Sequence, residues 1–366
     1  MKLGIFCNYG PPHIGGSEFV ISNVSKHLIE QYNYKTTIYS YMKNQLYLSG
    51  PEYCTRPCLK GDQLIAQINE NDHIFVYSDS FWGWDTVVQN IDKIVPDVSV
   101  ALVGAYNMRS HPEIAKQFLR NKSRYRVITH AEGFDYDWAI KNGLRVSVVP
   151  NGVDLAEFRE NKVDFRKDYH IKEKHVILNV SNFFYGKGQM YLPEICKLVS
   201  TEIEDCILVQ ISSTIDYSYG KIFRGRCIKK CDSMRVKSLF LQDIPRKDLI
   251  SAFLHSDVFL FPSQKEIASL VILECRAAKL PYVSMEVGNI REQSGGIVLP
   301  IIELDKKGYA VIKDNDIRHF YCGACHLLNQ HGKKRMRGRV IEEGQKGIEG
   351  LDWKNIVPLY DKVFQL

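Results

Sequence analysis

The sequence of 366 residues lacks the features that mark several specialised classes of protein. No uninterrupted apolar stretch approaches the ~20 residues that a membrane span needs. The first residues, Met1–Phe6, carry one basic side chain and run into a polar stretch too soon for a secretory signal. We therefore expect a folded protein of the cytoplasm, with a peripheral position at the membrane surface as the open alternative.

The ten cysteines lack the spacing of a structural metal site. Each of the C-x3-C pairs, Cys54/Cys58 and Cys227/Cys231, is without the close second pair that structural zinc sites show. The run Cys322–His326 matches the haem-attachment pattern, but apolar residues recur around it at helical spacing and haem attachment requires export. Reduced thiols, and no metal, are the expectation.

Length and patterning predict two α/β domains. With 45% hydrophobic and 25% charged residues the chain is an ordinary folded protein. At 366 residues it exceeds the roughly 250–300 at which a single core stops growing. Short apolar runs alternate with amphipathic stretches, as in parallel sheets. The predicted strands are Leu3–Cys7, Thr36–Tyr39, His73–Tyr77, Val98–Val103, Val127–Thr129, Val146–Val149, Val176–Val180, Cys206–Ile211, Ser238–Leu241, Val258–Phe261 and Tyr282–Ser284.

A polar stretch after the turn signal Pro150–Gly152 predicts the linker. The expected domains are 1–165 and 166–350, followed by one more amphipathic helix over 351–366. Further helices are predicted over Glu18–Gln31 and Val271–Lys279, and near Tyr191–Ser200 and Asp248–His255.

Glycine-rich turns follow the first predicted strand of each domain. Gly15 and Gly16 precede the first helix, where backbone amides and the helix dipole favour an anion such as a diphosphate. The pattern G-x-G-x-x-G of dinucleotide sites is absent. In the second domain Lys187 stands between Gly186 and Gly188 and could neutralise a leaving phosphate, although an exposed loop lysine is equally compatible.

Two glutamates follow a later strand of the second domain. Glu266 falls in the loop after the strand, and Glu274 lies in the first turns of the next helix. Both can then face the carboxyl ends of the strands, where open α/β sheets bind ligands. Glu274 follows Val271, Ile272 and Leu273. A carboxylate is unusual in such an apolar stretch unless it makes hydrogen bonds.

Together these residues resemble the retaining GT-B glycosyltransferases of family 4. The resemblance covers essentially the whole chain, and it is the order and spacing of the motifs that make it specific. The motifs are Pro-Pro-His-x-Gly-Gly-x-Glu at 11–18, Val149–Asp154, Lys187–Gln189, Ser256–Ser263, Glu266-x7-Glu274, Val287-Gly-x-Ile-x-Glu292 and a closing helix at Trp353. It implies two Rossmann-like domains facing a central cleft, with the last helix crossing back to the first domain.

The resemblance also implies roles for individual residues. Glu274 would hold the ribose hydroxyls, Glu266 with the loop amides of Ile267, Ala268, Ser269 and Leu270 the donor sugar, and Lys187 with Gly15 and Gly16 the diphosphate. No metal is implied, and the co-substrate is a UDP- or GDP-sugar. In the mechanism that the resemblance implies, the departing phosphate oxygen would take the acceptor's proton, so that no protein nucleophile would be needed.

Three positions depart from the family pattern. Asn182 stands where an arginine is usual, Ser269 replaces a common glycine, and Gly104–Asn107 stands after the strand Val98–Val103 where the family often has a histidine. Loss of the arginine suggests an alternative, a binding protein with a decayed site, although Lys187, Glu266 and Glu274 argue against it. A sugar-nucleotide epimerase would need acid and base groups that the sequence does not offer.

The acceptor is expected on the first domain, and the leading class is a saccharide or lipid-linked saccharide. The candidate acceptor-side residues are Trp82, Trp84, Tyr106, Asn107, His111 and His130, although a core role is as plausible for one tryptophan and a structural role for each histidine. A basic stretch over 116–126 could face an anionic partner or be a solvated helix. The segment 221–237 carries seven basic residues against one acid, which leaves a modified base in DNA as the alternative acceptor.

Overall fold

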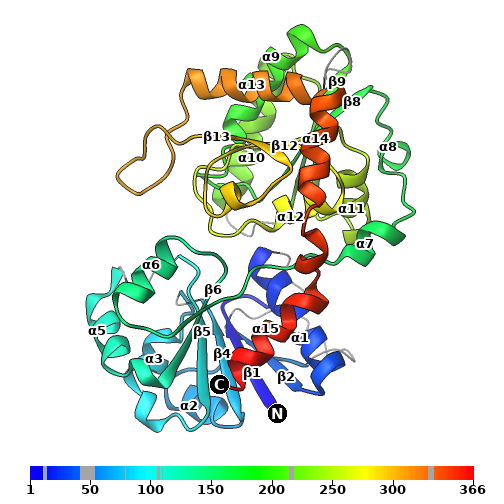
Figure 1. The fold of residues 1–366 in the computed structure, drawn as a ribbon. Coiled ribbons are helices and arrows are strands. Elements are labelled where there is room, and N and C mark those ends of the chain that lie inside the picture. Colours follow the sequence, from blue (N-terminus) through cyan, green and yellow to red (C-terminus); the bar gives the residue numbers. More distant parts are fainter. Residues whose placement is uncertain are drawn as a thin grey trace. The chain divides into compact units, whose positions relative to one another are not determined.

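The computed structural model describes residues 1–10, 15–41, 54–78, 80–104, 108, 110–213, 218–328 and 334–366. These residues form two compact units (Figure 1). The first comprises Met1–Gly152 together with Leu351–Leu366, and the second comprises Val153–Gly350.

The first unit is built on a seven-stranded parallel sheet in the order β3-β2-β1-β4-β5-β6-β7. Central strands such as β4 are buried throughout, as parallel strands covered on both faces must be. The strands are β1 (Lys2–Cys7), β2 (Lys35–Ser40), β3 (Cys54–Pro57), β4 (His73–Tyr77), β5 (Asp97–Ala101), β6 (Tyr125–Thr129) and β7 (Val146–Val148).

Alternation along β4 assigns the helices of this unit to its two faces. Ile74 and Val76 belong to a core cluster with α2, α3 and α5, whereas the Phe75 ring lies 5.4 Å from Phe364 of α15. α1 packs beside α15, which places both on that second face. The helices are α1 (Gly16–Tyr32), α2 (Gly61–Ile68), α3 (Trp84–Gln89), α5 (Pro112–Arg120), α6 (Phe134–Lys141) and α15 (Trp353–Phe364).

The C-terminal helix α15 returns to the first unit, as the resemblance implies. Its Asp361 accepts a hydrogen bond from the Tyr34 hydroxyl at 2.5 Å, and the Phe364 carbonyl accepts one from Arg126 at 2.8 Å. Trp353 is fully buried against Gly152, where a Cβ would collide with the indole. The point at which the chain leaves the first unit is therefore packed against the point at which it returns.

The second unit is built on a six-stranded parallel sheet in the order β10-β9-β8-β11-β12-β13. Because β8 and β11 are neighbours, the loops that follow them leave the same edge of the sheet side by side. The strands are β8 (His175–Val180), β9 (Cys206–Ser212), β10 (Ser238–Gln242), β11 (Val258–Phe261), β12 (Tyr282–Met285) and β13 (Gly296–Leu299).

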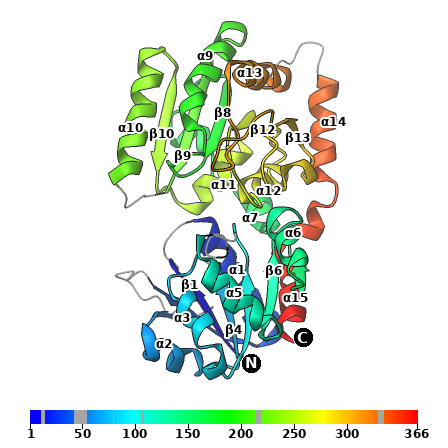
Figure 2. The ribbon, with the colours of Figure 1, turned by 90° about the vertical axis from the view of Figure 1, so that its left-hand side faces the viewer.

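Helices cover both faces of this sheet, and α10 lies beside the edge strand β10 (Figure 2). α13 packs on β11, β12 and β13, with Gly323 against the Val283 side chain. The helices are α7 (Leu155–Glu160), α8 (Phe165–Asp168), α9 (Leu192–Glu202), α10 (Ser218–Ser233), α11 (Arg246–Leu254), α12 (Leu270–Ala277), α13 (Asp314–Leu328) and α14 (Lys334–Gln345).

The boundary between the units falls at Gly152, earlier than the residue 165 expected from the sequence. Residues after it bond within the second unit. Asn161 donates to the Lys247 carbonyl at 2.7 Å, and the Phe165 amide donates to Ser251 Oγ at 3.1 Å. The polar stretch predicted to be a linker is thus largely the start of the second unit.

All eleven predicted strands are present, and two further strands, β3 and β13, were missed. Each has four residues, and neither shows a run of β-branched or aromatic residues long enough to stand out. The Cys322–His326 run lies within the helix α13, as expected. Among the described residues, no helix is long and apolar enough to cross a membrane.

Candidate functional site

The loop after β8 is shaped by two glycines that flank Lys187. Gly186 and Gly188 have φ of +95° and +72°, values that other residues rarely adopt. A Cβ on Gly188 would collide with the Pro262 carbonyl oxygen, and the Gly186 carbonyl accepts a hydrogen bond from the Gln264 amide at 2.7 Å. The loops after β8 and β11 are thereby locked together, with Lys187 at the junction.

At this junction Lys187 forms an ion pair with Glu266. Lys187 Nζ lies 2.6 Å from Glu266 Oε1, and the Ser263 hydroxyl donates to the same oxygen. The side chain of Glu266 is 12% exposed and that of Lys187 is 31% exposed. A partly shielded ammonium at the carboxyl edge of a parallel sheet is suited to bind an anionic ligand, which would compete with Glu266 for it.

Asn182, which replaces the usual arginine, accepts hydrogen bonds from other residues of the second unit. Its Oδ1 accepts from the Ser213 hydroxyl at 2.6 Å and from the Ser213 amide at 3.1 Å. Its backbone carbonyl accepts from Gln189 Nε2 at 2.6 Å. The Asn182 oxygens therefore join the loops after β8 and β9, and the charge of the missing arginine is not replaced at this position.

The loop Ile267–Leu270 leads into the helix α12, which begins at Leu270. The Ile267 carbonyl accepts from the Asn289 amide at 3.0 Å, and Gly288, with φ of +56°, lies so close that a Cβ would collide with that carbonyl. Ser269 precedes the helix and makes no capping hydrogen bond with its side chain. The first amides of α12 have no acceptor within the helix, so this end suits an oxygen-rich ligand.

Glu274 is buried and paired with an arginine that the sequence did not single out. Arg246 Nη1, at the start of α11, donates to Glu274 Oε1. The same guanidinium bonds Glu157 of α7 at 2.8 and 3.1 Å. Burial raises the pKa of Glu274, and the neighbouring Arg246 opposes that rise. The helix predicted to start near Asp248 begins two residues earlier, at Arg246.

The first unit has its own glycine turn, at the start of α1. Gly15 is the N-cap residue, in an extended conformation, and Gly16 opens the helix. Glu18 is 7% exposed and its carboxylate folds back against Gly15. Residues 11–14 of the same motif lie outside the described part of the chain. The roles of Gly15 and Gly16 stay predictions.

Burial raises the pKa of Glu18 from 4.5 to about 7. Between these values the folded state holds a proton that the unfolded state has lost, so the free energy of unfolding falls as pH rises from about 4.5 to 7. Glu18→Gln should remove this fall, gaining about 3 kcal/mol relative to wild type as pH rises from 4.5 to 8. Chemical unfolding across that range measures it, with the exposed Glu132→Gln as control. Equal pH slopes in all three proteins would refute the buried carboxyl.

The two tryptophans predicted on the acceptor side differ in the exposure of their side chains. Trp82 is 55% exposed and stands edge-on to Tyr41 at 5.2 Å, with its amide bonded to Asn8 Oδ1 at 2.8 Å. Trp84 is fully buried against Phe118 and so belongs to the core.

The two candidate histidines also differ in exposure. His130 is 2% exposed and bonded to the Tyr77 hydroxyl and the Val149 carbonyl, which removes it from the surface candidates. His111 is exposed before α5. Tyr106 and Asn107 lie outside the described residues. Trp82 is thus the described aromatic candidate whose ring is available for stacking.

Much of the predicted basic surface makes contacts within the protein. In the 116–126 stretch Arg124 donates to the Ile94 carbonyl, and Arg126 pairs with Asp97. On α10, Lys230 pairs with Glu194 at 2.6 Å. Lys221, Arg226 and Lys229 are exposed on that helix, so the positive field of 221–237 is weaker than its composition indicates.

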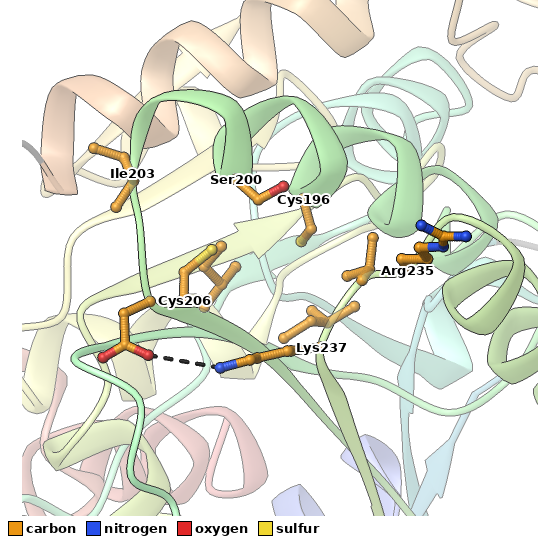
Figure 3. A pocket seen from close by; sticks show the side chains of 10 residues that line it. Cys196, Ser200, Ile203, Cys206, Arg235 and Lys237 are labelled. Atoms are coloured by element: carbon orange, nitrogen blue, oxygen red, sulfur yellow. Dashed lines mark ion pairs between the residues drawn. The ribbon is translucent and has the colours of Figure 1, made fainter.

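A cavity of about 190 Å³ lies at the amino ends of β8, β9 and β10 (Figure 3). Its lining includes Cys196 and Cys206, and Lys237, which lies 3.7 Å from Asp205. The amino ends form the edge of the sheet opposite to Lys187. Since ligands of open parallel sheets bind at the carboxyl ends, we do not assign the donor to this cavity.

Comparisons with known proteins bear on the fold and on the second unit. Residues 161–295 match the family model described as Glycosyl transferases group 1. The structure resembles a UDP-forming α,α-trehalose-phosphate synthase from Burkholderia xenovorans (TM-score 0.76, 11% identity, 100% of both chains) and Anabaena HepE in complex with UDP and glucose (0.75, 13%, 100% and 99%). Sucrose-phosphate synthase from Thermosynechococcus elongatus gives 0.73 at 14% identity, covering 100% and 98%.

A sequence relative is the Escherichia coli UDP-Gal:α-D-GlcNAc-diphosphoundecaprenol α-1,3-galactosyltransferase, 26% identical over 183 residues. The matched region spans 47% of this chain and 46% of that enzyme. The fold is thus the GT-B class of glycosyltransferase fold, with two Rossmann-like domains. Within that class, residues 161–295 are similar to the group 1 glycosyl transferases.

Proposed function

We propose that this protein transfers a sugar from a nucleoside diphosphate sugar to a hydroxyl group, with retention at the anomeric carbon and without a metal ion. The observation that carries the proposal is the Lys187–Glu266 pair at the junction of the loops after β8 and β11. A cation and a carboxylate side by side there match the needs of a donor, whose diphosphate is anionic and whose sugar is rich in hydroxyl groups.

In the proposed reaction the bond between the anomeric carbon and the diphosphate oxygen breaks. The acceptor oxygen bonds to that carbon on the same face, and its proton passes to the departing phosphate oxygen. Lys187 stabilises the charge that develops on this oxygen, which is the usual function of a preorganised cation at a leaving group. Glu266 and the first amides of α12 hold the sugar hydroxyls, and Glu274 holds the ribose.

A saccharide or lipid-linked saccharide is the acceptor class that we favour. The E. coli relative is named for transfer from UDP-Gal to a sugar on diphosphoundecaprenol, and the HepE complex holds UDP and glucose. Exposed Trp82 offers a face on which a sugar ring could stack. A lipid-linked acceptor would bring the protein to a membrane surface. The DNA acceptor stays a prediction from the sequence alone.

Release of nucleoside diphosphate from a panel of UDP- and GDP-sugars tests this proposal, beginning with UDP-sugars and with oligosaccharides as acceptors. We expect turnover with one donor, unchanged by EDTA, and an α-linked product from an α-linked donor by NMR. Absence of release with every donor would favour the decayed binding protein. An inverted product, or a strict requirement for added divalent metal, would contradict the retaining, metal-free reaction.

A further inference from the structure

Arg246 connects two carboxylates of different helices in the second unit. Its Nη2 lies 2.8 Å from Glu157 Oε2, its Nε bonds both oxygens of that group, and its Nη1 donates to Glu274 Oε1. The side chain of Glu274 is only 7% exposed, whereas those of Arg246 and Glu157 are each 30% exposed. Glu274, the more buried of the two carboxylates, is therefore bound by Arg246 through Oε1 alone.

The charges around Glu274 depend on this arginine. Burial raises the pKa of Glu274, and the charge of Glu157 raises it further, whereas Arg246 lowers it. Burial alone would lower the pKa of Arg246, but the two carboxylates raise it above its usual value. Without the guanidinium, a buried carboxylate beside a second carboxylate would take up a proton.

Among the residues that the structure describes, no second cation forms an ion pair with Glu274. On α12 itself, Arg276 donates to the Gly344 and Lys346 carbonyls, away from Glu274, and the neighbouring Cys275 is a buried thiol. From α14 the Gly344 carbonyl accepts a hydrogen bond from Arg276, and Gln345 donates to the Arg276 carbonyl. Within the described residues, Glu274 Oε1 accepts the hydrogen bond from Arg246 and Oε2 accepts none.

We infer that Arg246 is a positioning residue for the nucleotide: it fixes Oε1 of Glu274, keeps that carboxylate charged, and leaves Oε2 to accept the ribose hydroxyls. The inference rests on the proposed function, because it assumes that Glu274 contacts ribose. It assigns to Glu157 the task of holding the guanidinium in place. Arg246 then acts on the ligand through Glu274 rather than by touching it.

A double-mutant cycle with UDP and GDP as probes tests this inference. Calorimetry would compare wild type, Arg246→Met, Glu274→Gln and the double variant at pH 6 and pH 9. We expect Arg246→Met to weaken binding about tenfold at pH 6, the scale of a lost charge-assisted bond, and less at pH 9, because a higher pH favours the ionised carboxylate. In the Glu274→Gln background the Arg246 substitution should have little further effect, because its target is already neutral.

Arg291→Met is the matched control, since Arg291 forms an exposed pair with Glu286 in the same unit. Should Arg246→Met fail to fold, Arg246→Lys keeps the charge and loses the planar fork, and should bind about threefold more weakly only while Glu274 is present.

Different results would overturn the inference and the proposed function on which it rests. Wild type that binds neither UDP nor GDP overturns the proposed function together with the inference. Binding that is weakened by Glu274→Gln but not by Arg246→Met or Arg246→Lys overturns the inference alone. So do additive effects of the two substitutions, or a loss that is the same at both pH values.

Discussion

Replacing Lys187 with alanine is expected to lower kcat by about 10²-fold or more, the range seen when one preorganised donor is removed from a transition state. Lys187 Nζ lies 2.6 Å from Glu266, so the ammonium is already held at the edge where the leaving phosphate would gain charge. The effect should appear in kcat and kcat/KM alike, because charge develops in the transition state more than in the bound donor.

Lys265→Ala is the control for this substitution. Lys265 lies two residues after Ser263 in the same loop, but its Nζ stands over the Tyr309 ring at 5.1 Å and donates to the Lys307 carbonyl. Its removal should leave kcat within a few-fold of wild type. Steady-state kinetics with the best donor measure both variants. A Lys187→Ala enzyme whose loss lies entirely in KM would contradict a role for Lys187 in the transition state.

Gly188→Ala is expected to disrupt the junction between the loops after β8 and β11. The residue has φ of +72°, and a Cβ would collide with the carbonyl oxygen of Pro262. Strain at such a φ costs about 1–3 kcal/mol, and a collision with backbone cannot be relieved by turning a side chain. We expect a lower unfolding temperature for the second unit and loss of donor turnover, because Lys187 is the preceding residue.

Gly225→Ala supplies the comparison for Gly188→Ala. Gly225 lies within α10, and a Cβ there meets no atom within 4 Å. Alanine should therefore stabilise that helix slightly, by up to about 1 kcal/mol, and leave turnover unchanged. Thermal unfolding and donor release on the three proteins decide the matter. A Gly188→Ala protein as stable and as active as wild type would mean that the two loops are not locked together.

The features that sequence predicted well are those with a local signal. Strands such as Val258–Phe261 are continuous apolar runs bounded by polar residues, and the structure confirms them. Glycines around Lys187 predict a tight turn, which the positive φ values of Gly186 and Gly188 confirm. Trp353 and its helix return to the first unit as the resemblance implied. The ligands of these residues stay predictions.

What could not be predicted depends on contacts between distant residues. Trp82 and Trp84 are two positions apart, yet one is exposed and the other lies in the core, because a turn rather than a strand separates them. Arg246 lies 28 residues from Glu274 and 89 from Glu157. The only sequence signal for Arg246 was its position shortly after the carboxyl end of β10, the sheet edge at which ligands bind. The hydrogen bond between Asn182 and Ser213 could not be predicted either, because the sequence does not show which residues of the loops after β8 and β9 lie opposite each other.

Hydrogen exchange of the full chain with saturating UDP, and separately GDP, tests most directly where the donor binds. The account predicts that one nucleotide slows exchange at amides of 182–190 and 263–274, the loops around Lys187, Glu266 and Glu274. It predicts no change at 203–208 and 235–237, around the cavity on the opposite edge. Protection confined to that cavity or to the basic helix α10 with either nucleotide, or no protection with both, would contradict the assignment of the donor site.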